Sequence, residues 1–119
     1  MRNFRELEVW KDARRLVKEI YLITKQLPQE EKYGLISQIN RCVISIPANI
    51  AEGSSKYSQK DFVRFLQISL GSAYELESHL ILCADLEFIK YEEISPVIDE
   101  LQILQKRIAS LIKYNNSKH

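Results

Sequence analysis

The sequence contains little glycine and little proline, with three of each among its 119 residues. An all-β protein uses these residues in its many turns, so their scarcity argues against that class. No apolar run approaches the ~20 residues that a membrane-spanning helix needs, and the charged N-terminal stretch does not look like a secretory signal. We therefore expect a cytoplasmic protein with no membrane partner.

The chain also lacks an excess of charge of either sign. It carries 17 basic and 16 acidic side chains, which gives a net charge of +1. A dedicated nucleic-acid-binding protein usually carries a clear positive excess, because neutralising phosphates dominates its affinity. The balance therefore disfavours nucleic-acid binding for the chain as a whole, although residues 1–27 hold a mild basic excess.

Residues that commonly carry catalysis or bind metals are scarce. The two histidines are His79, within a helical pattern, and His119, the last residue. The two cysteines, Cys42 and Cys83, lie in apolar helical patterns without a CxxC partner, so we expect them to be buried as small hydrophobes. The three glycines are dispersed and form no phosphate-binding loop. We therefore predict no enzyme activity, no cofactor, no metal site and no small-molecule substrate.

Apolar residues at spacings of three and four predict four helices, at about 6–26, 31–53, 58–86 and 92–113. The length suits one domain spanning residues 1–119. Because short connections make neighbouring helices antiparallel, we predict an all-α, antiparallel up-down-up-down four-helix bundle. Ser58 predicts the N-cap of the third helix, and Gly53 the C-terminal cap of the second. The fourth helix begins between Tyr91 and Pro96, and residues 115–119 are expected to form a frayed tail.

The second predicted helix is apolar around most of its circumference. Only Arg41 is charged between Ser37 and Ala51. Such a helix is usually covered on more than one side, whereas a bundle covers only one, so we expect a second copy of the chain to supply the rest. Pro47 lies inside this helix and predicts a kink, because it cannot donate to the carbonyl of Val43. The kink serves either internal packing or a surface shaped for a partner.

Three groups of polar residues are candidate partner surfaces. A stripe along the second helix is either its solvated face or a hydrogen-bonded seam, within the kink or between subunits, and we favour the seam; it comprises Arg41, Ser45, Asn49 and Glu52. Two basic groups are candidate nucleic-acid contacts, with plain solvated charge as the alternative. One is the loop with Lys56, Tyr57, Lys60 and Arg64, where cations flank an aromatic ring that can stack on a base. The other, on the first helix, consists of Lys11, Arg15 and Lys18.

Four stretches of the sequence resemble a known family. They are FRELEVW at residues 4–10, KYGLISQINR at 32–41, SIPANIAEGSSKYSQKDFVRFL at 45–66 and GSAYELESHL at 71–80. Together they resemble the 23S rRNA-intervening-sequence proteins over nearly the whole chain, and SIPANIAEG is the most specific stretch. The resemblance implies a bacterial four-helix bundle that assembles as a ring-forming homo-oligomer, commonly a pentamer.

The same resemblance implies two functional settings. Some family members are encoded within insertions in ribosomal RNA genes. A related branch, the accessory protein of diversity-generating retroelements, binds nucleic acid through a markedly basic surface, whereas this chain is nearly neutral. We therefore expect a non-enzymatic, homo-oligomeric interaction or scaffold module, with RNA or DNA binding as the alternative. The positions that match the family motif, which we expect to be structural or interfacial, are Arg41, Ser45, Pro47, Asn49, Glu52 and Gly53.

Overall fold

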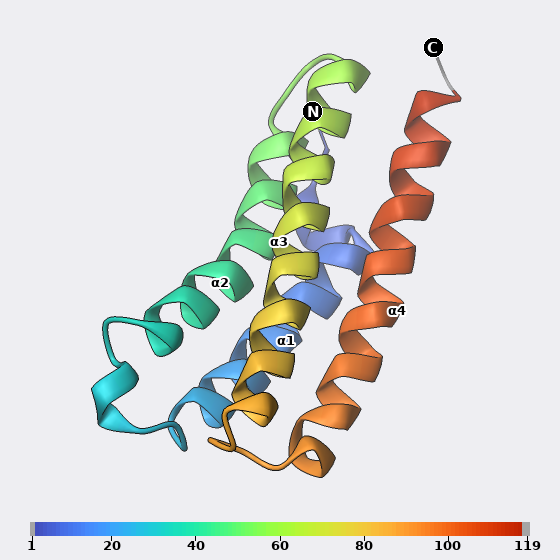
Figure 1. The fold of residues 1–119 in the computed structure, drawn as a ribbon. Helices are drawn as coiled ribbons and strands as arrows, with labels where there is room; N and C mark the ends of the chain where they lie inside the picture. Colours follow the sequence, from blue (N-terminus) through green and yellow to red (C-terminus); the bar gives the residue numbers. More distant parts are fainter. Residues whose placement is uncertain (1, 118–119) are drawn as a thin grey trace.

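The computed structural model describes residues 2–117, which form four long helices and two short 3-10 turns. The helices are α1 (Glu8–Thr24), α2 (Leu35–Ser54), α3 (Gln59–Asp85) and α4 (Tyr91–Asn116), and the turns are η1 (Phe4–Glu6) and η2 (Gln29–Glu31). Successive helices run in opposite directions (Figure 1), with α1 and α3 each packed against both α2 and α4. The chain is therefore an all-α four-helix bundle, as predicted.

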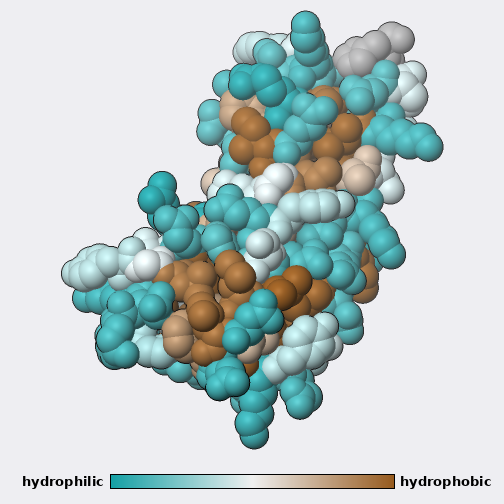
Figure 2. Space-filling model, in the orientation of Figure 1, coloured by the Kyte–Doolittle hydropathy of each residue, from teal (hydrophilic) through white to brown (hydrophobic). Residues whose placement is uncertain are grey.

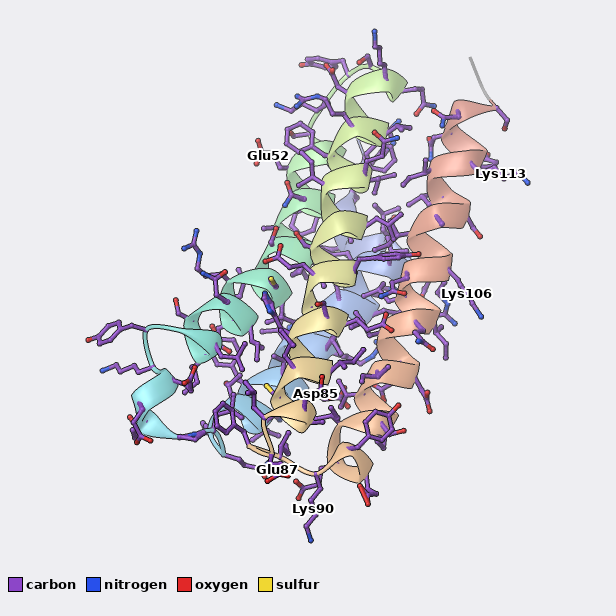
Figure 3. All side chains as sticks on the ribbon, in the orientation of Figure 1. Glu52, Asp85, Glu87, Lys90, Lys106 and Lys113 are labelled. Atoms are coloured by element: carbon purple, nitrogen blue, oxygen red, sulfur yellow. The ribbon has the colours of Figure 1, made fainter. Side chains whose placement is uncertain are left out.

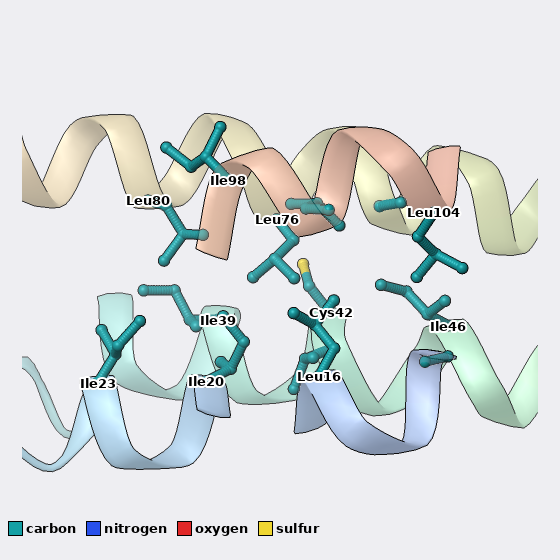
Figure 4. Packing of buried hydrophobic residues seen from close by; sticks show 14 of the residues in the cluster. Leu16, Ile20, Ile23, Ile39, Cys42, Ile46, Leu76, Leu80, Ile98 and Leu104 are labelled. Atoms are coloured by element: carbon teal, nitrogen blue, oxygen red, sulfur yellow. The ribbon is translucent and has the colours of Figure 1, made fainter. Parts of the chain in front are cut away.

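The core fills the space between the four helices with aliphatic side chains, whereas the face of the molecule in Figure 2 is mostly hydrophilic, with apolar side chains gathered in two patches. In Figure 4, Ile20 of α1, Ile39 of α2, Leu76 and Leu80 of α3 and Leu104 of α4 converge there, and each is at least 98% buried. Burying a side chain of this size stabilises a fold by about 1.5–3 kcal/mol. Both cysteines are free and lie in the same core, as predicted. None of the helices described over residues 2–117 combines the length and apolar character needed to cross a membrane.

The predicted start of the second helix, near residue 31, was wrong. Residues 29–31 instead form the 3-10 turn η2, and α2 begins at Leu35. Glu31 explains the later start, because its Oε1 accepts a hydrogen bond from the backbone N–H of Leu35 at 3.3 Å. The first N–H groups of a helix have no partner inside it, so this carboxylate takes the place of a capping residue.

The last helix is longer than predicted at its C-terminal end. It begins at Tyr91, the earlier of the starts that the sequence left open, and it runs to Asn116. Asn115 was expected to lie in a frayed tail, but it is buried and its side-chain amide donates to the carbonyl of Leu111 at 2.8 Å. Residues 118 and 119, the last two of that predicted tail, lie outside the described part of the chain.

Gly53 does not form the predicted helix cap. It lies within the last turn of α2, and its φ is not positive. A Cβ added at Gly53 would lie 2.7 Å from the Cβ of Phe65 and 3.3 Å from Cδ1 of Phe62. Glycine is required here because α2 and α3 approach each other too closely for a side chain to fit. The predicted N-cap is correct, since Ser58 Oγ accepts from the N–H of Asp61 at 3.1 Å.

Pro47 lies inside α2, between its two halves. In Figure 1 the first half of α2 leans away from α3, whereas the second half runs alongside it. Proline removes the helical donor to the Val43 carbonyl, which allows the helix axis to change direction at this point. The different directions of the two halves of α2 are what a kink at Pro47 would produce.

The turn between α3 and α4 contains Glu87 (Figure 3), whose φ of 62° is the left-handed conformation that usually requires glycine. The N–H of Phe88 donates to the Cys83 carbonyl at 3.0 Å, and the N–H of Glu87 donates to the Ala84 carbonyl at 3.0 Å. These are the two hydrogen bonds of a Schellman motif, which ends a helix and satisfies its last carbonyl groups. Glu87 therefore holds the position at which the chain leaves α3 and turns toward α4.

We predict opposite effects of the same substitution at two glycines. Gly53→Ala places a methyl group against Phe65, so it should lower the free energy of unfolding by about 1–3 kcal/mol. Gly71 is exposed within α3, and an added Cβ would have no atom within 4 Å. Gly71→Ala should therefore raise the free energy of unfolding by about 0.5–1 kcal/mol, because alanine favours a helix. Urea unfolding followed by circular dichroism measures both, and equal changes would contradict the close approach at Gly53.

Candidate functional site

Two members of the predicted polar stripe, Ser45 and Asn49, take part in a hydrogen-bonded seam between α2 and α3. Ser45 Oγ shares a hydrogen bond with Ser72 Oγ at 2.8 Å. The side-chain amide of Asn49 donates to the carbonyl of Ser45 at 2.8 Å and to its Oγ at 2.9 Å. Ser69 Oγ donates to the carbonyl of Ile46 at 2.9 Å. The seam lies within one chain, where it holds the middle of α2 against α3.

The other two members of the stripe, Arg41 and Glu52, are exposed, and Glu52 points away from the bundle in Figure 3. The stripe is thus divided into an inner hydrogen-bonded pair and two outer charged residues. The sequence analysis did not identify Ser69 and Ser72 of α3 as partners of α2. Their spacing of three, on the side of α3 that carries buried residues, was the available signal.

Basic side chains of α1 and η1 surround a depression of about 1010 Å³. It brings together all three predicted contacts of this helix and two further cations that the sequence analysis missed; the basic lining consists of Arg5, Lys11, Arg14, Arg15 and Lys18. Trp10 lies in the same depression, with its ring 5.0 Å from that of Phe4 and 5.5 Å from the Arg14 guanidinium. Cations around an aromatic ring form a surface suited to anions and to stacked bases.

Part of this basic charge is neutralised within the chain. Lys11 Nζ lies 3.6 Å from Oε1 of Glu8. Arg15 pairs with Asp12, and Asp12 also pairs with Arg107 of α4, which ties α1 to α4. Ion pairs at a surface contribute only about 0–1 kcal/mol, so a phosphate can compete for these cations.

The loop between α2 and α3 places its cations around a different ring from the one expected. The Nζ of Lys56 lies 5.2 Å, and the guanidinium carbon of Arg64 4.6 Å, from the centroid of Phe65. Tyr57, the ring that the sequence suggested, is 87% exposed. Lys60 and Arg64 line a separate depression next to Asn116. The basic group of α1 and the basic group of the loop between α2 and α3 therefore form two separate surfaces.

Comparison with known proteins places this bundle in a family. The family model described as 23S rRNA-intervening sequence protein matches residues 5–110. The chain belongs to that family. A crystal structure from Bacteroides thetaiotaomicron, described as a protein with unknown function from the S23 ribosomal protein family, is similar, with a TM-score of 0.81 and 31% sequence identity over 88% of this chain and 98% of that one. No match to a curated protein was found.

The structure gives the SIPANIAEG stretch of this intervening-sequence family member a packing role. Ile46 and Ile50 are fully buried in the core. Ser45 and Asn49 form the seam with α3, and Gly53 allows the close approach to Phe65. The stretch that is most specific in sequence therefore contains the contacts that join α2 to α3.

Glu19 lies at the edge of the basic depression and against Glu100 of α4. The pKa of Glu19 is raised to about 7, first because it shares a hydrogen bond with Glu100, and further because it is partly buried and the charge of Glu100 repels a second negative charge. The positive charge of Arg15 acts in the opposite direction. One proton is therefore held between these two carboxyl groups below neutral pH.

This carboxyl pair predicts a pH dependence of stability. Between pH 4.5, the ordinary pKa of glutamate, and about 7, the folded chain keeps a proton on Glu19 that the unfolded chain releases. The free energy of unfolding should therefore fall as pH rises through this window. Glu19→Gln cannot ionise, so its stability relative to the wild type should increase from pH 5 to pH 8 by on the order of 1 kcal/mol. Urea titrations across this range measure the difference, and parallel curves for the two proteins would disprove it.

Proposed function

We propose that this protein is a non-enzymatic, homo-oligomeric interaction module whose copies associate through the outer face of α2. The observation that supports it most is the exposure of apolar side chains on that face. Ile44 is 47% exposed, Ala48 is exposed and Ala51 is partly exposed. Covering this surface with a second copy would remove it from water, at a gain of roughly 25 cal/mol per Å² of apolar area.

A second apolar surface supports assembly into a ring. Leu7, Val9, Ile103 and Leu111 line a groove of about 490 Å³ between the start of α1 and α4. Ile103 in this groove is 51% exposed. When two different surfaces of one chain bind each other head to tail, the assembly closes into a ring if the rotation between copies permits. The family resemblance favours a ring of five copies.

The state of the two thiols supports a non-enzymatic role. Burial raises the pKa of Cys42 to about 12 and that of Cys83 to about 11. In Cys42 a hydrogen bond to Glu75 and the charge of that carboxylate raise the pKa further. The nucleophilic form of cysteine is the thiolate, so neither residue is an activated nucleophile at neutral pH.

The assembly is tested by a charge placed on the outer face of α2. Ile44→Glu should convert the oligomer to a monomer at micromolar concentration, because the interface would have to bury a carboxylate without a partner. Ile81→Glu on α3 is the matched control, since Ile81 is similarly exposed at 40%, and it should leave the assembly intact. Size-exclusion chromatography with light scattering measures the mass. A wild-type protein that is monomeric at this concentration would refute the proposal.

The basic depression on α1 supports RNA or DNA binding as a second candidate function. It combines five cations, one aromatic ring and a single carboxylate in one hollow. A ring of copies would repeat this depression around the assembly. Repetition raises the effective concentration of each site once one site has bound, so a nearly neutral chain can still bind a polyanion.

Binding of a single-stranded RNA oligonucleotide across salt concentrations tests this function. The double variant Arg14→Gln/Lys18→Gln should weaken binding at low salt about tenfold or more. It should also reduce the slope of log affinity against log salt by about 1.4, because each lost phosphate contact contributes about 0.7. Lys90→Gln/Lys113→Gln makes the same charge change at exposed positions elsewhere (Figure 3) and should change neither quantity. Wild-type protein that fails to bind RNA at low salt would exclude this candidate.

A further inference from the structure

Cys42 on α2 and Glu75 and His79 on α3 bring three metal-binding side chains together. One ligand atom from each residue lies within 4.8 Å of the other two. Oε2 of Glu75 lies 3.2 Å from Nε2 of His79. Figure 4 shows the side chain of Cys42 leaving α2 toward the side of α3, near Leu76. The cluster therefore spans the boundary between the two helices.

The spacing of these atoms is close to that of a tetrahedral zinc site. Zn²⁺ binds cysteine sulfur at about 2.3 Å and histidine nitrogen or carboxylate oxygen at about 2.0–2.2 Å, which places neighbouring ligand atoms roughly 3.3–3.6 Å apart. The pair Glu75–His79 already has this separation, at 3.2 Å. Cys42 reaches it through a small movement of its side chain, because its Sγ is within 4.8 Å of both partners.

The two sides of the cluster differ in their access to solvent. The ligand nitrogen of His79 is Nε2, the ring atom that faces Oε2 of Glu75 at 3.2 Å. Glu75 is exposed, which gives an ion a path from solvent, whereas Cys42 is only 6% exposed and closes the inner side. Arg41, the cation beside Cys42 in the chain, is also exposed.

We propose that Cys42, Glu75 and His79 form a Zn²⁺ site with three protein ligands and a fourth position open to solvent. Coordination converts the Cys42 thiol and Zn²⁺ to a zinc-bound thiolate and releases one proton to water. The ion would tie the first half of α2, which leans away from α3, to the middle of α3. The sequence places Glu75 one helical turn before His79, but the sequence analysis expected no metal, because the sulfur ligand comes from a different helix.

Titration of the reduced, metal-free, full-length protein with Co²⁺, followed by displacement with Zn²⁺, tests the site. One equivalent of Co²⁺ should produce a thiolate-to-metal charge-transfer absorption together with the visible bands of tetrahedral Co²⁺. Cys42→Ala should abolish the charge-transfer absorption. His79→Gln and Glu75→Gln should each weaken Zn²⁺ affinity at least about tenfold. If Cys42→Ala does not fold, the Zn²⁺ affinities of His79→Gln and Glu75→Gln test the site.

Cys83→Ala is the matched control. Cys83 is also a buried free thiol, but it belongs to no group of three metal-binding side chains in the part of the chain that the structure describes. The Cys83→Ala variant should bind Co²⁺ and Zn²⁺ like the wild type. Zn²⁺ should raise the Tm of the wild type and of Cys83→Ala, but not that of His79→Gln, because only a metal held by the folded state stabilises it. Wild-type protein without a thiolate–Co²⁺ absorption, or unchanged affinity in both α3 variants, would overturn the proposal.

Discussion

The close contact between the second half of α2 and the first half of α3 organises the end of the bundle against which the N-terminal segment packs. At Gly53 the backbone of α2 lies so near Phe65 that no side chain fits between them. The seam of Ser45 and Asn49 continues the contact along α2. The N-terminal segment also packs at this end, where the N–H of Arg2 donates to the Ser54 carbonyl at 2.9 Å and its guanidinium lies 3.8 Å from the Phe62 ring.

The sequence determines the helices well because their apolar spacing and local caps are properties of neighbouring residues. Ser58 illustrates this, since its capping partner Asp61 is three residues away. The errors occur where the outcome depends on a distant segment. Gly53 looks like a helix cap in sequence and becomes a contact glycine only once Phe65 is placed beside it. The error at the start of α2 has a local cause instead, because the carboxylate of Glu31 that accepts from Leu35 lies in a 3-10 turn, which has no periodic signature.

The candidate surfaces were predictable to different degrees for the same reason. Lys11, Arg15 and Lys18 share one line of α1, so helical spacing alone groups them, and the structure adds Arg14 from the adjoining line. The loop cations could not be assigned to a ring, because whether they flank Tyr57 or Phe65 depends on how α3 begins. The cluster at Cys42 required the relative rotation of α2 and α3, which no local pattern contains.

Pro47 has a consequence for how this protein opens. The carbonyl of Val43 has no helical donor, so the hydrogen-bond ladder of α2 is interrupted between a segment that leans outward and a segment clamped onto α3. The outward segment can fray without breaking a continuous ladder, because its own helical hydrogen bonds and core packing, and not those of the second half, protect its amides from exchange. The first half of α2 can therefore open without the second half, which the seam and the close approach at Gly53 hold against α3.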